Sequence, residues 1–385
     1  MHRGPRSARP PSPCSTIANV KTWDAVIIGG GIVGLSLARQ LQIGGLKVLV
    51  IERHEPASEA SAAAGGMLAN CDPHTARVLK LLADTSAAMY PEFIRELELE
   101  SGETADLRDA GTIAWFERSE QPQCLKARRL NDAELFRMEP LLRLREDAWF
   151  LPERSVDPRG LGRALIKTSK RSGVDFVTGS AATAVLMAEG RVAGVRTTRS
   201  TYLAGIVVNC AGAWAGQIDP IRIPTRPVKG QMVCLVPQGD APHSGPLIEH
   251  VVRTPDVYII PRSDGRILLG ATVEDAGFDK QVQPEVVQEL YHAGIDAAPA
   301  LASMRIHDAW AGLRPGTPDT LPILGETTLP GYYAAAGHYR DGILLAPVTA
   351  HLMTQLITGC TPDLDLGVFS PLRFGEGVKT GASSA

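Results

Sequence analysis

The chain begins its patterned part with apolar runs that alternate with a helical pattern. Residues 25–28 form a short buried run, residues 32–41 carry apolar positions at helical spacing, and residues 47–51 form a second buried run. A strand, a helix and a strand in this order predict a βαβ unit with two parallel strands. Small residues fill positions 58–66, which we expect to be a loop, and residues 75–100 follow with a largely helical pattern.

Short β-rich runs dominate the middle of the chain around one well-marked helix. Asp157 followed by Pro158 is typical of a helix N-terminus, and Gly173 is expected to end that helix after residues 159–171. The predicted strands span residues 111–116, 174–178, 182–187, 192–198, 206–209, 227–236, 257–261 and 266–272. The last third predicts a strand at 331–335 and a glycine-punctuated helix at 343–357, and no internal repeat is visible.

Length and composition are those of a soluble globular protein with more than one domain. At about 150 residues per domain, 385 residues suggest two or three domains. Hydrophobic residues make up 44% and charged residues 21%, and a net charge of −3 offers no general attraction for nucleic acid or an anionic membrane. The longest weakly polar run, residues 25–38, is shorter than the roughly 18 to 20 apolar residues that cross a bilayer. We therefore expect a small-molecule ligand, with no nucleic-acid or membrane partner.

Neither the cysteines nor the histidines are spaced for a metal site. The six cysteines include no CxxC pair and the nine histidines lack ligand spacing, so we expect reduced thiols and no metal. Residues 1–23 hold four prolines and no acidic residue, and are predicted to be a disordered tail. Two origins stay open for this tail: an organelle transit peptide, or a plain bacterial-type extension, which we favour.

A glycine-rich turn joins the first predicted strand to its helix. Gly29, Gly31 and Gly34 form a GxGxxG fingerprint. In such a motif the first glycine allows the tight turn, the second lets the backbone approach a pyrophosphate, and the third permits close helix–strand packing. Glu52 ends the next strand about 20 residues later, where a carboxylate binds ribose hydroxyls and repels a 2′-phosphate. The motif predicts a dinucleotide site that disfavours NADP, but it does not separate FAD from NAD.

Six sequence blocks, in order along the chain, give a more specific signal. They are VIIGGG at 26–31, SAAAGGML at 61–68, VKG at 228–230, YIIP at 258–261, WAGLRPG at 310–316 and GHYRDGILLAP at 337–347. With these blocks the chain resembles the FAD-dependent D-amino-acid oxidase superfamily, and within it the glycine oxidases of thiamine biosynthesis. The resemblance extends from residue 24 to about residue 359.

The resemblance implies a two-domain α/β FAD-dependent oxidoreductase, with a Rossmann-like βαβ FAD domain and a mainly antiparallel-sheet substrate domain. The FAD domain is assigned to residues 24–72, 150–222 and 311–369, the substrate domain to residues 73–149 and 223–310, and a flexible tail to residues 370–385. The cofactor is expected to be non-covalent FAD, because no cysteine lies in residues 331–359, where monomeric sarcosine oxidases attach their flavin. By the same analogy we expect a cytoplasmic homo-oligomer, namely a tetramer.

The resemblance also assigns the FAD-binding residues. The loop at 61–67 lies along the flavin in that family, where small side chains let the backbone approach a planar ring. The pair Gly65 and Gly66 departs from the expected single glycine, so which of them contacts the flavin stays open. Val185 and Gly212 correspond to nucleotide-side positions, for which an ordinary core strand and turn are the alternative. The full implied set is Gly29, Gly31, Ile32, Val33, Gly34, Glu52, Arg53, Ser61, Ala64, Gly65, Gly66, Met67, Val185, Gly212, His338, Tyr339, Arg340, Asp341, Gly342, Ile343 and Leu344.

Two arginines and a tyrosine are the candidate substrate ligands. A guanidinium suits a substrate carboxylate because two parallel N–H donors match two oxygens. The resemblance places Arg314 on that carboxylate, with Tyr258 adding an O–H donor and Arg340 at the edge between flavin and substrate; surface or ion-paired arginines are the alternative. His338 is either a base or a neutral flavin contact. The helix that starts near residues 341–342 is expected to direct its N–H groups toward the flavin.

The expected reaction is the oxidation of glycine by oxygen and water to glyoxylate, ammonia and hydrogen peroxide. The resemblance implies no acid or base side chain, because the substrate gives a hydride to the flavin and oxygen reoxidises it. The glycine imine would supply thiamine thiazole synthesis, and sarcosine and small D-amino acids would be secondary substrates. The alternatives are a D-amino-acid dehydrogenase or oxidase, a sarcosine oxidase-like enzyme, and a flavin-binding tRNA-modification or assembly module without amine oxidation.

Overall fold

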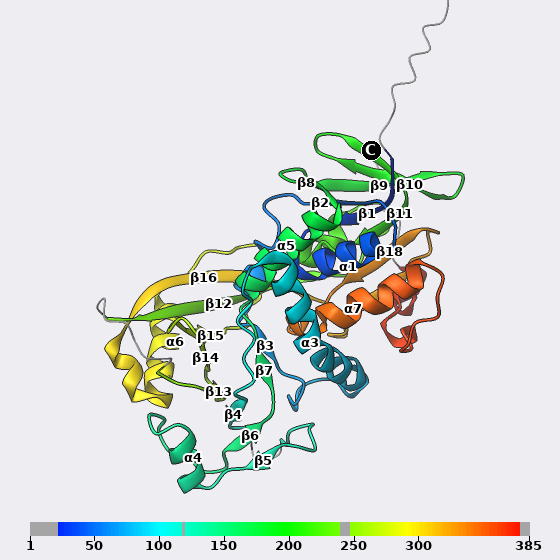
Figure 1. Ribbon diagram of the computed structural model, residues 1–385. Helices are drawn as coiled ribbons and strands as arrows, with labels where there is room; N and C mark the ends of the chain where they lie inside the picture. Colours follow the sequence, from blue (N-terminus) through cyan, green and yellow to red (C-terminus); the bar gives the residue numbers. More distant parts are fainter. Residues whose placement is uncertain (1–21, 118–119, 239–246, 378–385) are drawn as a thin grey trace, which may run out of the picture.

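Two large sheets form the framework of the computed structural model, which describes residues 22–117, 120–238 and 247–377 (Figure 1). The first sheet has the order β17 (Ile323–Glu326), β18 (Tyr332–Ala336), β11 (Thr201–Asn209), β1 (Thr22–Ile28), β2 (Val48–Ile51) and β8 (Asp175–Val177). From β18 to β8 all neighbours are parallel, while β17 is antiparallel to β18. β10 (Arg191–Thr197) and β9 (Ala182–Ala188) extend from β11 as an antiparallel pair. The predicted βαβ unit is confirmed.

Four helices cover one face of this sheet: α1 (Ile32–Ile43), α3 (Lys80–Ser101), α5 (Pro158–Ser172) and α7 (Gly342–Ile357). Side chains alternate along β1, so that Ala25 and Ile27 pack under the helices while Val26 and Ile28 pack on the opposite face with β9 and β10. Helix α5 begins as predicted, with the Asp157 side chain accepting from the Arg159 amide, and ends at Gly173 with φ of 97°. None of the helices among the described residues is both long and apolar enough to cross a membrane.

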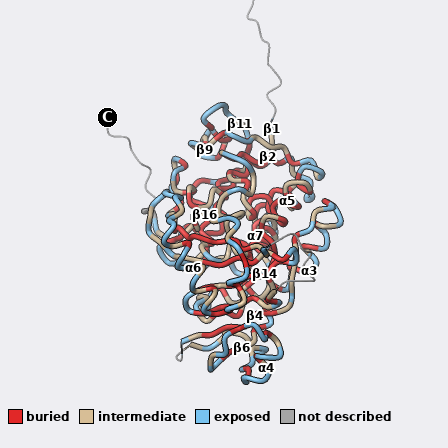
Figure 2. Tube along the Cα trace, turned by 90° about the vertical axis from the view of Figure 1, so that its left-hand side faces the viewer, coloured by how far each residue is buried: buried red, intermediate tan, exposed pale blue. Residues whose placement is uncertain are grey.

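The second sheet is antiparallel except between β13 and β4. Its order is β16 (Met304–Gly316), β12 (Arg226–Pro237), β15 (Ile267–Gly270), β14 (Tyr258–Pro261), β13 (Val251–Arg253), β4 (Thr112–Ala114), β6 (Trp149–Leu151) and β5 (Arg128–Arg129). Two further helices are α4 (Asp132–Met138) and α6 (Pro284–Ala297), and β3 (Met67–Leu68) pairs with β7 (Arg154–Ser155). Figure 2 shows buried segments running through both sheets. This is the expected two-domain architecture.

Several elements differ from the sequence prediction. Residues 60–63 form the one-turn helix α2 (Ala60–Ala63) inside the expected loop, and α3 starts at Lys80 after a 3₁₀ turn rather than at residue 75. The elements α4, α6, β16 and β17 were not predicted as such. Strand β1 starts at Thr22, within the predicted tail, whereas residues 1–21 lie outside the described part. A 3₁₀ segment, Pro371–Gly377, occupies the start of the predicted C-terminal tail, and the other 3₁₀ segments are Arg77–Leu79, Gly212–Gln217, Pro299–Ser303 and Gly367–Phe369.

Candidate functional site

One elongated cavity connects the two sheets. It starts at the β1–α1 turn of the first sheet and ends against β12, β14 and β16 of the second. Most sequence-predicted site residues line it: Gly29, Gly31, Ile32, Val33, Glu52, Arg53, Ser61, Ala64, Gly65, Gly66, Met67, Gly212, Tyr258, Arg314, His338, Tyr339, Arg340, Asp341, Gly342 and Ile343. The fold therefore brings together residues separated by some three hundred positions at one continuous surface.

The glycine fingerprint shapes the first end of the cavity. Gly29 has φ of 104°, and a Cβ on Gly34 would lie 2.1 Å from the Gly29 carbonyl oxygen, so α1 packs closely against β1. Gly31 is the N-cap of α1, and the amides of the first helical turn have no intrahelical acceptor. The Glu52 carboxylate accepts from the amides of Gly30 at 2.8 Å and His54 at 2.9 Å, which fixes it at the rim. This is the arrangement a dinucleotide pyrophosphate and ribose require.

Neither glycine of the 65–66 pair has open space for a side chain. A Cβ on Gly65 would lie 2.5 Å from Cδ1 of Ile260, and the Gly65 carbonyl accepts from Nη2 of the buried Arg262 at 2.6 Å. Gly66 has φ of 75°, and a Cβ there would lie 2.0 Å from the Val156 carbonyl oxygen. The pair therefore turns the chain tightly from α2 into β3, with both residues at the cavity surface.

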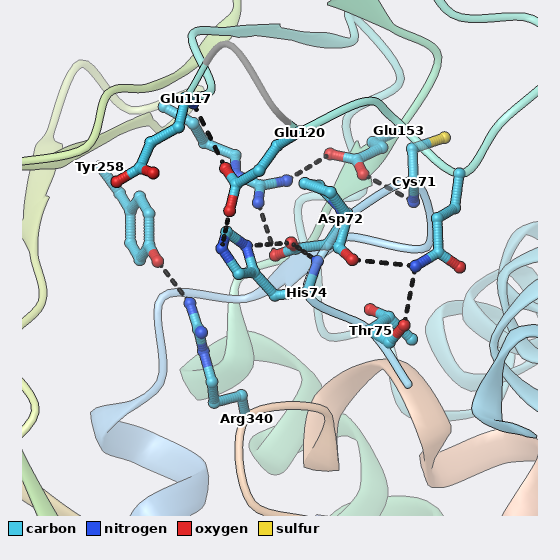
Figure 3. Close-up of polar contacts among 12 residues, drawn as sticks. Cys71, Asp72, His74, Thr75, Glu117, Glu120, Glu153, Tyr258 and Arg340 are labelled. Carbon is cyan, nitrogen blue, oxygen red and sulfur yellow. Dashed lines mark hydrogen bonds and ion pairs between the residues drawn. The ribbon is translucent and has the colours of Figure 1, made fainter. Parts of the chain in front are cut away.

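Arg314 and Arg340 converge at the second end of the cavity. Arg340 donates from Nη2 to the Tyr258 hydroxyl at 2.5 Å (Figure 3). Arg314 donates from Nη1 to the carbonyls of Thr272 at 2.9 Å and Lys229 at 3.3 Å, and within the described residues its Nη2 has no hydrogen-bond partner. Burial and the neighbouring Arg340 charge lower the pKa of Arg314 from its ordinary value. Two guanidiniums and a phenol are groups that can hold a carboxylate through charge-assisted hydrogen bonds.

An acidic and basic cluster borders this end of the cavity and was not found from the sequence. Asp72 lines the cavity and pairs with Nη2 of the buried Arg253 at 2.5 Å, while Arg253 also faces Glu153 at 3.4 Å. Figure 3 shows His74 pointing toward Asp72 and Glu120. Burial alone would raise the pKa of Asp72, but the Arg253 guanidinium holds it below its usual range. Its partners are remote in sequence, so no motif could have revealed the cluster.

The segment before α7 carries two perturbed groups. Burial lowers the pKa of His338 to about 4, and its Nε2 lies 3.0 Å from Oγ1 of Thr349, so the ring is neutral at physiological pH. A ring with this lowered pKa is a weak proton acceptor, which favours a flavin contact over a base among the two roles left open. Asp341 is the N-cap of α7 without a side-chain cap bond, and burial raises its pKa to about 6 against the opposing Arg340 charge. Tyr339 has φ of 48°, a left-handed backbone that non-glycine residues rarely adopt.

Three predicted cofactor residues do not line the cavity. Gly34 sits one helical turn behind it and serves the packing of α1 on β1. Val185 is buried in the core of the other sheet face, with its amide donating to the Asp219 carbonyl at 2.7 Å. Leu344 is buried in the first turn of α7, where its carbonyl accepts from the Ser86 hydroxyl of α3. Residues that line the cavity but were missed include Glu59, Asp72, Ala181, Ala182, Trp214, Gly230, Met232, Ile260 and Gly312.

Residues 24–356 match the model of the family described as FAD dependent oxidoreductase. The chain belongs to this FAD-dependent oxidoreductase family. It is 34% identical over 374 residues to the bifunctional protein ThiO/ThiG of Trichormus variabilis, covering 93% of this chain and 56% of that protein. It is 30% identical to the glycine oxidase of Pseudomonas aeruginosa over 90% of this chain and 98% of that one. The crystal structure of glycine oxidase from Geobacillus kaustophilus superposes with a TM-score of 0.85 at 30% identity, covering 91% of this chain and 99% of that one.

The chain spans about half the length of the bifunctional relatives. FAD is the cofactor that the family membership assigns to it, and the residues present fit that group. The α1 N-terminus and Glu52 suit the pyrophosphate and ribose, and the turn at Gly65 and Gly66 brings the backbone to the cavity surface.

Proposed function

We propose that the protein oxidises glycine with oxygen and water to glyoxylate, ammonia and hydrogen peroxide. The observation that carries this proposal is the carboxylate receptor made by Arg314, Arg340 and Tyr258 at the end of the cavity opposite the nucleotide fingerprint. Bound FAD would accept the hydride from the substrate carbon. The similarity to glycine oxidases over nine-tenths of the chain supports the same substrate. Sarcosine and small D-amino acids are proposed as secondary substrates.

In this proposal the protein side chains position the substrate and supply no acid or base. Arg314 would bind the substrate carboxylate through Nη2, while Nη1 stays on the backbone carbonyls that aim it. Tyr258 would donate to the same carboxylate and Arg340 would hold Tyr258 in place. His338 is neutral and buried, which keeps an additional positive charge away from the amine. The sheet containing β1 would bind FAD, and the sheet containing β14 and β16 would bind the substrate.

A role in thiamine thiazole synthesis is part of the proposal, supported by the similarity to proteins named ThiO/ThiG. We further propose a cytoplasmic homotetramer, by analogy with the glycine oxidase family; sedimentation of the holoenzyme tests the assembly.

The reaction itself is tested in air by measuring oxygen consumed, peroxide formed and glyoxylate formed. Equal amounts of all three support an oxidase. A D-amino-acid dehydrogenase, the main alternative, would form glyoxylate or another oxoacid only with an added dye or quinone, and no peroxide.

A further inference from the structure

The segment between β15 and α6, residues 271–283, reaches from the second sheet to the nucleotide end of the cavity. Both of its ends are fastened to Lys229 of β12. The amides and carbonyls of Glu274 and Lys229 bond to each other at 2.9 and 3.0 Å, and Lys229 Nζ donates to the Gln281 carbonyl at 2.6 Å. Lys229 itself is buried. Residues 275–280 therefore form a loop whose two ends are held by hydrogen bonds to Lys229.

Two middle residues of this segment complete a ring of five side chains. Lys280 Nζ lies 3.0 and 3.2 Å from the two carboxylate oxygens of Glu59, and Glu59 accepts from Arg53 Nη2 at 2.8 Å. The Arg53 guanidinium lies over the Trp214 ring, 3.4 Å from its centroid. Trp214 in turn packs on Phe278, with ring centroids 5.3 Å apart and planes tilted by 32°. Phe278 and Lys280 are two residues apart, so the ring closes on itself.

The ring stands at the nucleotide end of the cavity. Arg53, Glu59 and Trp214 line the cavity, whereas Phe278 and Lys280 do not line it and contact Trp214 and Glu59, respectively. Arg53 directly follows Glu52, the carboxylate at the position that binds ribose in dinucleotide folds. Glu59 is the N-cap of α2, so its position also sets where the small-residue helix begins. A group entering the ADP end of the site would lie within this enclosure.

We propose that Phe278 and Lys280 are positioning residues of the FAD site, which hold Arg53, Glu59 and Trp214 around the ADP half of the dinucleotide and slow its release. The inference rests on FAD as the cofactor and not on which amine is oxidised. The Lys280–Glu59 pair is solvent-accessible, with 46% and 21% of the two side chains exposed, so added salt weakens it. The Trp214–Phe278 contact is apolar and insensitive to screening. FAD retention therefore has one salt-dependent and one salt-independent component.

The test measures FAD release from purified holoenzyme by the rise of free-flavin fluorescence after dilution. The variants are Lys280→Met and Phe278→Ala, and the matched control is Lys167→Met. Lys167 is similarly exposed, at 43%, and pairs with Glu103 at 3.3 Å, away from the cavity. Each protein is measured at about 0.1 M and about 1 M NaCl, between which the Debye length falls from about 10 Å to about 3 Å.

Lys280→Met is expected to release FAD about threefold faster than the unaltered enzyme at the lower salt and at nearly the same rate at the higher. Phe278→Ala is expected to release it about fivefold faster at both, and Lys167→Met to match the unaltered enzyme at both. Release by Lys280→Met at the control's rate at low salt, or an equal salt dependence with and without Lys280, would overturn the proposal. If Phe278→Ala does not fold, the Lys280 comparison still decides. No amine substrate is added, so this result is independent of the glycine proposal.

Discussion

At the scale of single residues, the missing side chain of Gly230 leaves room for the Arg314 guanidinium. A Cβ at Gly230 would lie 2.2 Å from Arg314 Nη1, so the guanidinium rests directly on this glycine. Gly230→Ala is expected to displace Arg314 and raise the apparent KM for glycine about tenfold or more, since a lost charge-assisted bond costs about 1.5 to 3 kcal/mol. Gly205→Ala is the matched control, because nothing lies within 4 Å of its Cβ position. Equal KM values for the two variants would remove Arg314 from the carboxylate site.

Asp341 gives a residue-scale prediction about pH. Burial raises its pKa from 3.8 to about 6 in the folded protein, so folding favours the protonated form. The stability this group contributes is complete below its unfolded pKa and is lost as pH rises through about 6. In the unaltered protein, this titration should lower the free energy of unfolding by about 2 to 3 kcal/mol as pH rises from about 4 to about 6. Asp341→Asn should remove this pH dependence. Denaturation midpoints of both holoenzymes across this range provide the measurement, and parallel pH profiles would count against a raised pKa.

At the scale of elements, the turn from α2 into β3 depends on Gly66. Gly66 has a φ of 75°, and Gly190 has almost the same φ, 76°. A Cβ at Gly66 would lie 2.0 Å from the Val156 carbonyl oxygen, whereas a Cβ at Gly190 would have no atom within 4 Å. Gly190→Ala is expected to lower the free energy of unfolding by about 1 kcal/mol, for the left-handed backbone alone. Gly66→Ala should lower it by at least about 2 kcal/mol more, because the backbone must move. Chemical denaturation of both variants tests this, and similar losses would show that the turn is free to relax.

Sequence patterns predicted elements best where local signals were strong. Helix α5 carries its own boundaries in Asp157, Pro158 and Gly173, and all three act as expected. The short α2 was missed because alanine and glycine repeats look like a loop when no long apolar pattern accompanies them. Strand β16 was missed because its burial alternates irregularly while it pairs along β12. That pairing is a long-range property, which no local window contains.

At the scale of the whole molecule, the two sheets bring the nucleotide fingerprint and the cluster of Arg314, Arg340 and Tyr258 to one cavity. The motif blocks predicted most of this surface because all six contain residues that line the cavity. The Asp72–Arg253–Glu153 cluster escaped prediction, since its members come from positions up to 181 residues apart and carry no spacing rule. The same holds for the ring of Arg53, Trp214, Phe278, Lys280 and Glu59, which forms only when the segment at 271–283 crosses between the sheets.

If one end of the cavity binds FAD and the other binds the substrate carboxylate, the two functions should respond separately to mutation. Replacing Arg314 by Lys keeps a positive charge but loses the planar fork, so the apparent KM for glycine should rise by about tenfold or more while FAD release stays unchanged. Steady-state oxygen uptake gives the KM, and flavin fluorescence gives the release rate. A variant that lost FAD faster, with its KM unaltered, would show that Arg314 serves the cofactor end instead.

The most direct measurement is the visible spectrum of the holoenzyme under anaerobic conditions, before and after adding glycine. The account predicts that the oxidised flavin band bleaches with glycine and returns when air is admitted, with one hydrogen peroxide formed for each turnover. A flavin band that stays oxidised with glycine, but bleaches with a larger D-amino acid, would contradict the proposed substrate while leaving the cofactor site intact.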